Sequence, residues 1–222
     1  MTPTFALFDL DHTLLSGDSD VLWCDWLMRQ GLLERASFEP RNAAMEAGYK
    51  AGTVSVHEFS GFYVGTLAGR TPAQWEPLRR RFLAEEIAPR IPEPAHAQVR
   101  THQQAGHTVV LTTATNRVIT ELTAAHLGIE HLIATECELG PDGAYTGHVL
   151  GQPNMREGKV VRLREWLSAR GLALETLDSV AYSDSMNDAP LLQAARRAVA
   201  VDPDARLAAL AAERGWTVLR WR

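Results

Sequence analysis

The sequence predicts an α/β fold: a doubly wound, mostly parallel, Rossmann-like sheet with an inserted helical cap and a small β-hairpin. Three observations lead to this prediction. Short apolar strands and helices alternate along most of the chain at the spacing of βαβ units, which favours parallel strands with helices on both faces. The stretch 17–88 departs from this rhythm and shows only helical or irregular patterns. Residues 138–149, centred on Pro141-Asp142-Gly143, are typical of a hairpin.

The elements are expected in the following order. Phe5–Phe8 is a short buried strand, and a helix over about Val21–Leu33 opens the irregular stretch. The later strands are expected at Thr108–Leu111, Leu132–Thr135, Ser179–Tyr182, Ala198–Val201 and Trp216–Trp221. The later helices are expected at Ala95–Gln104, Val118–Leu127 and Lys159–Arg170. We therefore assign residues 1–16 and 89–222 to an α/β catalytic core and residues 17–88 to a helical cap domain.

Composition narrows the class of protein. The chain has 222 residues, of which 45% are hydrophobic and 22% charged, as in a globular domain with a sizeable core. A net charge of -5 disfavours nucleic acid or anionic lipid as a partner, and no apolar run is long enough to span a membrane. The two cysteines, Cys24 and Cys137, provide no disulfide framework, which fits a reducing cytoplasm. The oligomeric state is left open.

Polar residues gather where three predicted strands end. The clusters are Asp9/Asp11/Thr13, Thr112/Thr113/Thr115 and Asp184/Asn187/Asp188. Ligands of open parallel sheets bind at the carboxyl ends of the strands, so neighbouring strands would bring the clusters together. Lys159, at the start of a predicted helix, could add a cation there. It is one of only two lysines among 22 basic residues.

Such a cluster suits phosphate chemistry. Carboxylate oxygens favour Mg²⁺, which is usually held by one or two carboxylates and keeps water and substrate phosphate as its other ligands. An aspartate can act as a nucleophile, and a second carboxylate two residues on can transfer protons. Each feature alone has a simpler interpretation. Lys159 by itself is typical of a solvated helix residue, and Asp184 with Asp188 is typical of a helix start. Only the ordered combination favours a site.

Four motifs carry a resemblance to a known family. They are "FDLDHT", "VVLTTAT", Gly158-Lys159 and "YSDSMNDAPLL", and the hairpin "GAYTGHV" adds to them. With these motifs the chain resembles phosphatases of the haloacid dehalogenase superfamily, in the phosphoserine phosphatase-like branch. The resemblance covers nearly the whole chain. It implies a phosphoric monoester hydrolase whose helical cap closes over a small-molecule phosphate ester.

The resemblance also implies roles for the acidic residues. Asp9 would be the nucleophile that forms an aspartyl-phosphate, and Asp11 the general acid and base. Asp9, the main-chain carbonyl of Asp11, and Asp184 would ligate Mg²⁺, with Asp188 holding a metal-bound water. Thr113 and Lys159 would bind the phosphate. Asn187 would belong to the same phosphate-binding group and would order the loop that carries it.

The sequence differs from phosphoserine phosphatases at positions that affect the choice of substrate. The arginine that grips the substrate carboxylate in phosphoserine phosphatases has no obvious counterpart here, and Tyr63 falls near its position. Asp18 falls where those enzymes carry an acidic residue that recognises the substrate amine. The chain's opening also resembles bacterial histidinol-phosphate phosphatases of the superfamily, whose substrate has an amine and no carboxylate. A second interpretation of Asp18 is a helix N-cap.

The expected function is a cytoplasmic, Mg²⁺-dependent phosphomonoesterase that acts on a small metabolite, such as the amino-alcohol phosphate histidinol phosphate. Three alternatives stay open at this point. They are a phosphoserine phosphatase, a phosphotransferase or mutase that uses the same aspartyl-phosphate, and a non-catalytic binding protein that kept the fold.

Overall fold

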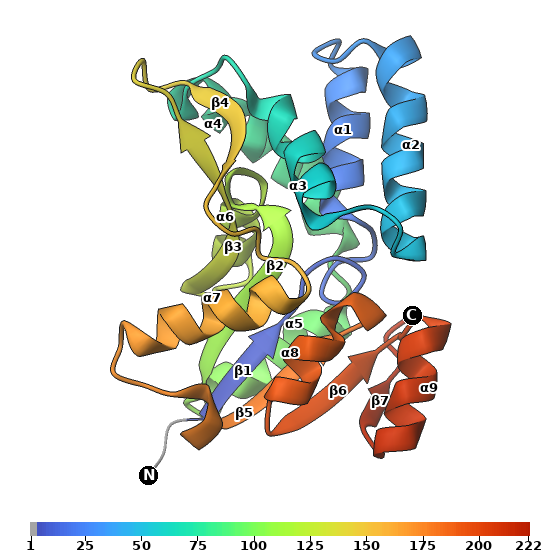
Figure 1. Ribbon diagram of the computed structural model, residues 1–222, viewed down its shortest axis with the longest axis vertical. Helices are drawn as coiled ribbons and strands as arrows, with labels where there is room; N and C mark the ends of the chain where they lie inside the picture. Colours follow the sequence, from blue (N-terminus) through green and yellow to red (C-terminus); the bar gives the residue numbers. More distant parts are fainter. Residues whose placement is uncertain (1–3) are drawn as a thin grey trace.

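A seven-stranded sheet forms the centre of the computed structural model, which describes residues 4–222 (Figure 1). The strands lie in the order β4-β3-β2-β1-β5-β6-β7. Their bounds are β1 Thr4–Phe8, β2 Thr108–Asn116, β3 His131–Leu139, β4 Tyr145–Leu150, β5 Asp178–Ser183, β6 Arg197–Val201 and β7 Thr217–Leu219. Every pair is parallel except β3 with β4, which form the predicted hairpin. The predicted fold class is confirmed.

Helices cover both faces of the sheet because β1 is apolar on both sides. Its even residues Ala6 and Phe8 pack with α5 (Glu93–Gln104) and α6 (Arg117–His126), whereas Phe5 and Leu7 pack with the helices on the other face. Those helices are α7 Glu157–Ser168, α8 Ala189–Ala194 and α9 Ala205–Arg214. This arrangement is the doubly wound one expected for a mostly parallel sheet.

The stretch between β1 and α5 is helical, as predicted. Its α-helices are α1 Ser19–Arg29, α2 Arg35–Ala51, α3 Val56–Val64 and α4 Pro72–Phe82, and short π and 3₁₀ turns lead on to Arg90. They stand above the carboxyl end of the sheet in Figure 1. The division into a core (1–16, 89–222) and a cap (17–88) stays an interpretation, and residues 1–3 lie outside the described residues.

Aromatic packing joins the helical stretch to the sheet. The rings of Trp23, Trp26, Trp75 and Phe82 lie 5.0–5.9 Å apart and belong to the same apolar cluster as Phe8. The three tryptophans therefore serve as core residues. None of the helices that the structure describes has the length and apolar character needed to cross a bilayer.

Several element bounds differ from prediction, and those of the first helix and of β2 have clear local reasons. The first helix starts at Ser19 because Asp18 caps it, and it ends at Arg29, before Gly31 with φ 70°. Strand β2 runs on to Asn116 because Asn116 pairs with Thr135 after a shift in register. Two helices that the pattern does not predict, α8 and α9, are short helices that pack against β6.

Candidate active site

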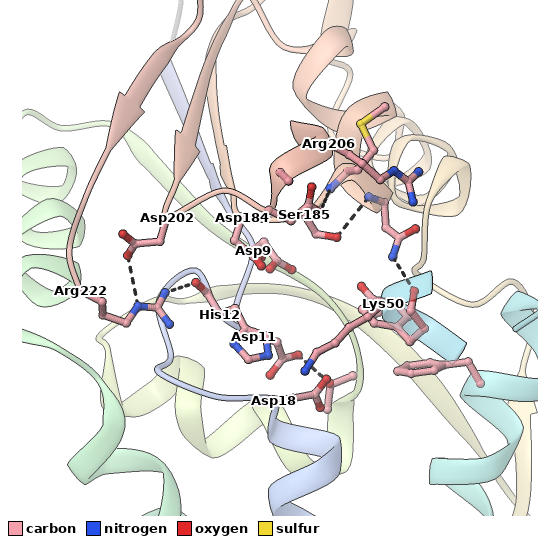
Figure 2. Close-up of a pocket in the computed structure, with 18 residues that line it drawn as sticks. Asp9, Asp11, His12, Asp18, Lys50, Asp184, Ser185, Asp202, Arg206 and Arg222 are labelled. Carbon is pink, nitrogen blue, oxygen red and sulfur yellow. Dashed lines mark hydrogen bonds and ion pairs between the residues drawn. The ribbon is translucent and has the colours of Figure 1, made fainter. Parts of the chain in front are cut away.

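The three predicted clusters do meet. Strand β1 lies between β2 and β5, with Phe8 opposite Leu111 on one side and Tyr182 on the other. The residues that follow these positions therefore come to the same edge of the sheet. Asp9 is anchored there by its main-chain N–H, which donates to the carbonyl of Tyr182 at 3.0 Å. Figure 2 shows Asp9 beside Asp184 on one wall of a cavity.

Lys159 lies beneath this edge, between two carboxylates. Its Nζ is 2.6 Å from Asp9 Oδ1 and 2.6 Å from Asp188 Oδ2, and the residue is only 2% exposed. Ser183 Oγ donates to Asp188 Oδ2 at 2.8 Å. A buried ammonium is tolerated only when paired in this way. Lys159 is thus a fixed, desolvated cation beside Asp9.

The start of α7 depends on a glycine. A Cβ on Gly158 would lie 2.3 Å from the carbonyl oxygen of Pro153, so no other residue fits without a backbone shift. Nearby, the amide of Asn154 donates to the carbonyls of Thr113 and Ile133 at 2.9 Å each. Sequence reasoning missed Asn154, which ties the loop before α7 to the ends of β2 and β3. Together these residues place Lys159.

Thr13, a member of the first cluster without an assigned role, links the first and third clusters. Its hydroxyl lies 3.2 Å from Asp9 Oδ2 and 3.2 Å from Asp184 Oδ1, and it accepts from the N–H of Asp184 at 3.0 Å. The carboxylates of Asp9 and Asp184 therefore flank one buried hydroxyl. This contact brings two oxygen ligands within reach of a single small cation.

The electrostatics favour such a cation. Burial raises the pKa of Asp9 to about 7 against the opposing effect of Lys159. Burial, and then repulsion from Asp9 and Asp188, raises the pKa of Asp184 well above its usual range. Burial disfavours the charged form of Lys159, but the carboxylates of Asp188 and Asp9 outweigh it and raise the pKa of this ammonium. One lysine therefore offsets too little of the negative charge.

The donor set fits Mg²⁺. Within residues 4–222, no three His, Cys, Asp or Glu side chains converge as a ready-made metal site. Two carboxylates, Asp9 and Asp184, face the same hydroxyl, and all donors here are oxygen atoms. Two protein carboxylates are enough for Mg²⁺, because water and substrate phosphate provide its other ligands. Oδ2 of Asp188 accepts hydrogen bonds from Lys159 and Ser183. This arrangement fits the expected role of Asp188 in holding a metal-bound water and not a direct bond to the metal.

The side chain of Asp11 is held away from Lys159. Its Oδ1 accepts from the main-chain N–H of Ser19 at 2.6 Å, and its Oδ2 accepts from Thr115 Oγ1 at 2.9 Å. Thr113 Oγ1 is 3.4 Å from the same oxygen and is fully buried, so it lies behind the cavity wall. Asn187 does line the cavity, where its Nδ2 lies 3.4 Å from the carbonyl of Tyr49.

The cavity above these residues has a volume of 670 Å³ and a second wall from the helical stretch. Tyr49, Lys50 and Phe59 form that wall, and the rings of Tyr49 and Phe59 lie 4.6 Å apart. Sequence reasoning missed all three. The rarity of lysine was the only sequence feature that singled out Lys50. Lys50 extends toward the centre of the cavity in Figure 2, and it pairs with Glu46 at 2.5 Å.

Asp18 caps the first helix and also lines the cavity. Its Oδ1 accepts from the N–H groups of Asp20 and Val21 at 3.0 Å each, so it caps α1. It also lines the cavity (Figure 2). Burial, and then the charge of Asp11, raises the pKa of Asp18 to about 7. A cationic group in the cavity would favour its charged form.

Several other residues of the helical stretch lie away from the cavity. Tyr63 is buried and does not line the cavity. Arg70 stacks on Trp75, with its guanidinium carbon 4.8 Å from the ring centre. The arginines at 79, 80 and 81 pair with glutamates. The helical stretch therefore contributes one cation to the cavity, Lys50.

Comparison with known proteins agrees with this geometry. Residues 6–193 match the family described as haloacid dehalogenase-like hydrolase. The chain belongs to this family. It is 38% identical to a histidinol-phosphatase of Neisseria meningitidis serogroup C (strain 8013) over 98% of both chains. It is 32% identical to a phosphoserine phosphatase of Mycobacterium tuberculosis over 98% of this chain and 70% of that protein.

Solved structures give the same picture of the fold. A protein with unknown function from Bordetella pertussis Tohama I has a TM-score of 0.93 at 42% identity, with 99% of each chain covered. A substrate-bound phosphoserine phosphatase complex has a TM-score of 0.69 at 19% identity, covering 99% of this chain and 93% of that one, a likeness of fold alone. The predicted family membership is confirmed.

Proposed function

We propose that this protein is a Mg²⁺-dependent phosphoric monoester hydrolase that works through an aspartyl-phosphate on Asp9. The observation that carries the proposal is the position of the Asp9 carboxylate, on the cavity wall, 2.6 Å from the buried Lys159 ammonium and bridged to Asp184 by Thr13. Phosphoryl transfer needs positioning and charge neutralisation above all. This cluster can provide both.

The residues of the chain divide the reaction between them. An oxygen of Asp9 attacks phosphorus, the bond to the leaving oxygen breaks, and Asp11 gives that oxygen a proton. Water then attacks the phosphorus of the acyl phosphate, Asp11 takes a proton from it, and phosphate leaves. Lys159 stays beside Asp9 and offsets charge as it develops. Asp9, Asp184 and the main-chain carbonyl of Asp11 would hold Mg²⁺, which would supply Lewis-acid stabilisation of the phosphate oxygens.

For the substrate we propose an amino-alcohol phosphate such as histidinol phosphate. Asp18 places a carboxylate in the cavity where a cationic amine could pair with it. Tyr49 and Phe59 offer an aromatic wall on which a planar imidazole could stack. The relative named histidinol-phosphatase, which aligns over 98% of both chains, supports this choice.

Lys50 favours a second candidate, phosphoserine. A lysine on the cavity wall could pair with a substrate carboxylate, and phosphoserine carries both an amine and a carboxylate. Two observations weigh against it. Lys50 is already paired with Glu46, and both of these side chains are open to solvent, where ion pairs contribute little.

The test is a comparison of kcat/KM for histidinol phosphate, phosphoserine and p-nitrophenyl phosphate, each with Mg²⁺ and after chelation by EDTA. We expect histidinol phosphate to be the best substrate and activity to disappear in EDTA. A preference for phosphoserine that is lost in Lys50→Met would establish the second candidate. Absence of hydrolysis with all three would support a binding protein, and transfer of phosphate to an added alcohol in preference to water would support a phosphotransferase.

A further inference from the structure

The hydroxyl of Thr115 lies between two carboxyl groups. Its Oγ1 is 2.9 Å from Asp11 Oδ2 and 3.1 Å from Asp20 Oδ2. Ser19 Oγ lies 3.1 Å away on a third side. Thr115 belongs to β2, whereas Ser19 and Asp20 form the first turn of α1. The contact therefore joins the sheet edge to the first helix of the helical stretch at the side chain of Asp11.

Counting protons constrains this cluster. A threonine hydroxyl has one proton to donate and two lone pairs that accept. If Thr115 donates to Asp11, then Asp20 Oδ2 faces only lone pairs and must carry a proton of its own. If both carboxyls were ionised, one short oxygen–oxygen contact would have no proton in it. Such a contact inside the protein is strongly unfavourable. A proton on Asp11 alone would fill the contact but would leave Thr115 as the single donor to a buried Asp20 carboxylate.

The surroundings of Asp20 indicate that it carries this proton. The residue is 2% exposed, and its Oδ1 has no hydrogen-bond partner among the described residues. A buried carboxylate with a bare oxygen would leave its charge unsolvated, whereas a neutral carboxyl leaves only a weak acceptor unpaired. Burial, and then the charges of Asp18 and Asp11, raises the pKa of Asp20 well above its usual range. Among residues 4–222, no cation lies within hydrogen-bond distance of it.

We propose that Asp20 is a positioning residue which, as a neutral carboxylic acid, donates to Thr115 and through it fixes the Asp11 carboxyl for proton transfer. The inference rests on the proposed function, because it assigns Asp11 the proton-transfer role. Asp11 is then held on two sides, by the N–H of Ser19 on Oδ1 and by Thr115 on Oδ2. Asp20 and Thr115 do not touch the substrate in this arrangement.

Leaving groups of different basicity can isolate this role. The release of p-nitrophenol needs no proton, but the release of an alkyl alcohol such as histidinol does. Because kcat/KM covers only the steps up to release of the alcohol, the later hydrolysis of the aspartyl-phosphate does not enter the comparison. In Thr115→Val we expect kcat/KM for histidinol phosphate to fall by about 10-fold to 100-fold, a partial loss of the about 10²-fold to 10⁴-fold that general acid catalysis usually contributes, and for p-nitrophenyl phosphate by about threefold at most.

Two variants control for packing. Thr115→Ser keeps the hydroxyl and should restore most of the lost activity. Thr120→Val makes the same exchange at a fully buried threonine whose hydroxyl donates to the carbonyl of Asn116, and it should leave both substrates unaffected. At position 20, Asp20→Asn can still donate to Thr115 and should resemble the wild type, whereas Asp20→Leu should behave like Thr115→Val.

The proton on Asp20 can be observed without any substrate. The infrared difference spectrum between the wild type and Asp20→Asn at neutral pH should show the carbonyl band of a protonated carboxylic acid. Carboxylate bands in its place, or equal losses on both substrates in Thr115→Val, would overturn the inference. If the wild type hydrolysed neither substrate, the proposed function would fail instead, and the infrared result would still report on Asp20.

Discussion

The two walls of the cavity are built in different ways. On the wall formed by the sheet edge, every acidic side chain has a close partner: Asp9 and Asp188 pair with Lys159, and Asp184 contacts Thr13. On the wall formed by the helical stretch, Tyr49 and Phe59 present aromatic rings. The one charge that α2 adds there, on Lys50, is balanced by Glu46 on the same helix.

This difference suggests a division of labour. A network of buried, mutually bonded charges can hold reacting atoms in fixed positions, which is what phosphoryl transfer requires. A wall of rings and solvent-exposed charge can distinguish substrates but has little influence on the phosphate. Substitutions of Asp9, Asp184 or Lys159 on the first wall should therefore affect all phosphate esters alike, and substitutions on the second wall should affect some esters more than others.

The largest effect is expected at Asp9. Asp9→Asn should lower kcat by at least about 10³-fold for every ester, because the amide keeps the shape but is a poor nucleophile. Asp178→Asn is the matched control, since Asp178 lies at the opposite end of β5 and pairs with Arg197. Substantial activity in the Asp9 variant, with its circular dichroism spectrum unchanged, would remove Asp9 from the mechanism.

The two lysines allow the same substitution on both walls. Lys159→Arg should cost about 10²-fold in kcat, nearly as much as Lys159→Ala, because the planar guanidinium does not fit where a compact ammonium contacts two carboxylates. Lys50→Arg should cost less than about tenfold, since Lys50 is solvent-exposed and its charge is kept. Similar losses at both positions, measured with p-nitrophenyl phosphate, would show that the walls do not differ as described.

Metal removal should disturb only the first wall, where Asp9 and Asp184 would hold Mg²⁺. EDTA should abolish hydrolysis, and Asp184→Ala should weaken Mg²⁺ activation with partial recovery at high Mg²⁺. Ca²⁺ should inhibit, because it accepts more ligands in looser geometry. Activation curves at increasing Mg²⁺ provide the measurement, and full activity in EDTA would contradict the proposed role of the metal.

The sheet-edge wall could be predicted from sequence because its residues follow short apolar strands directly. Asp9 comes straight after Phe5–Phe8, and parallel pairing then fixes which strand ends become neighbours. The partners of these residues were harder to find. Asn154 and Ser183 act through single hydrogen bonds that no local pattern specifies.

The helical wall could not be predicted in the same way. Tyr49, Lys50 and Phe59 come from two helices whose packing over the sheet edge depends on tertiary contacts, and nothing in their spacing points to a cavity. Trp23, Trp26 and Trp75, also from this stretch, form part of the core, because large rings gain most from full burial.

Substrate preference should respond to Asp18. Asp18→Asn removes the charge but keeps a good N-cap, so α1 should stay intact. We expect kcat/KM for histidinol phosphate to fall by about tenfold, the loss of roughly one charge-assisted hydrogen bond, with p-nitrophenyl phosphate nearly unchanged. Equal losses on both substrates would mean that Asp18 supports the catalytic loop and does not select the substrate.

The smallest effect concerns stability and a region outside both walls. His102 is buried beside Tyr182 and His107, and burial, then the neighbouring His107, lowers its pKa to about 4. The unfolded chain, with a histidine pKa near 6.5, binds this proton more readily than the folded one, so the His102 contribution to stability is lost as pH falls from about 6.5 to 4. Urea unfolding of the wild type and His102→Gln across this range should show a shallower loss in the variant.

Trapping the intermediate tests the central claim most directly. The enzyme is mixed with substrate, quenched in acid within the first turnover and treated with borohydride, which reduces an aspartyl-phosphate to homoserine. Peptide mass spectrometry should find homoserine at position 9 in the wild type and none in Asp9→Asn. Homoserine at the position of another aspartate would contradict the account. So would an active enzyme that yields no homoserine because water attacks the substrate phosphate directly.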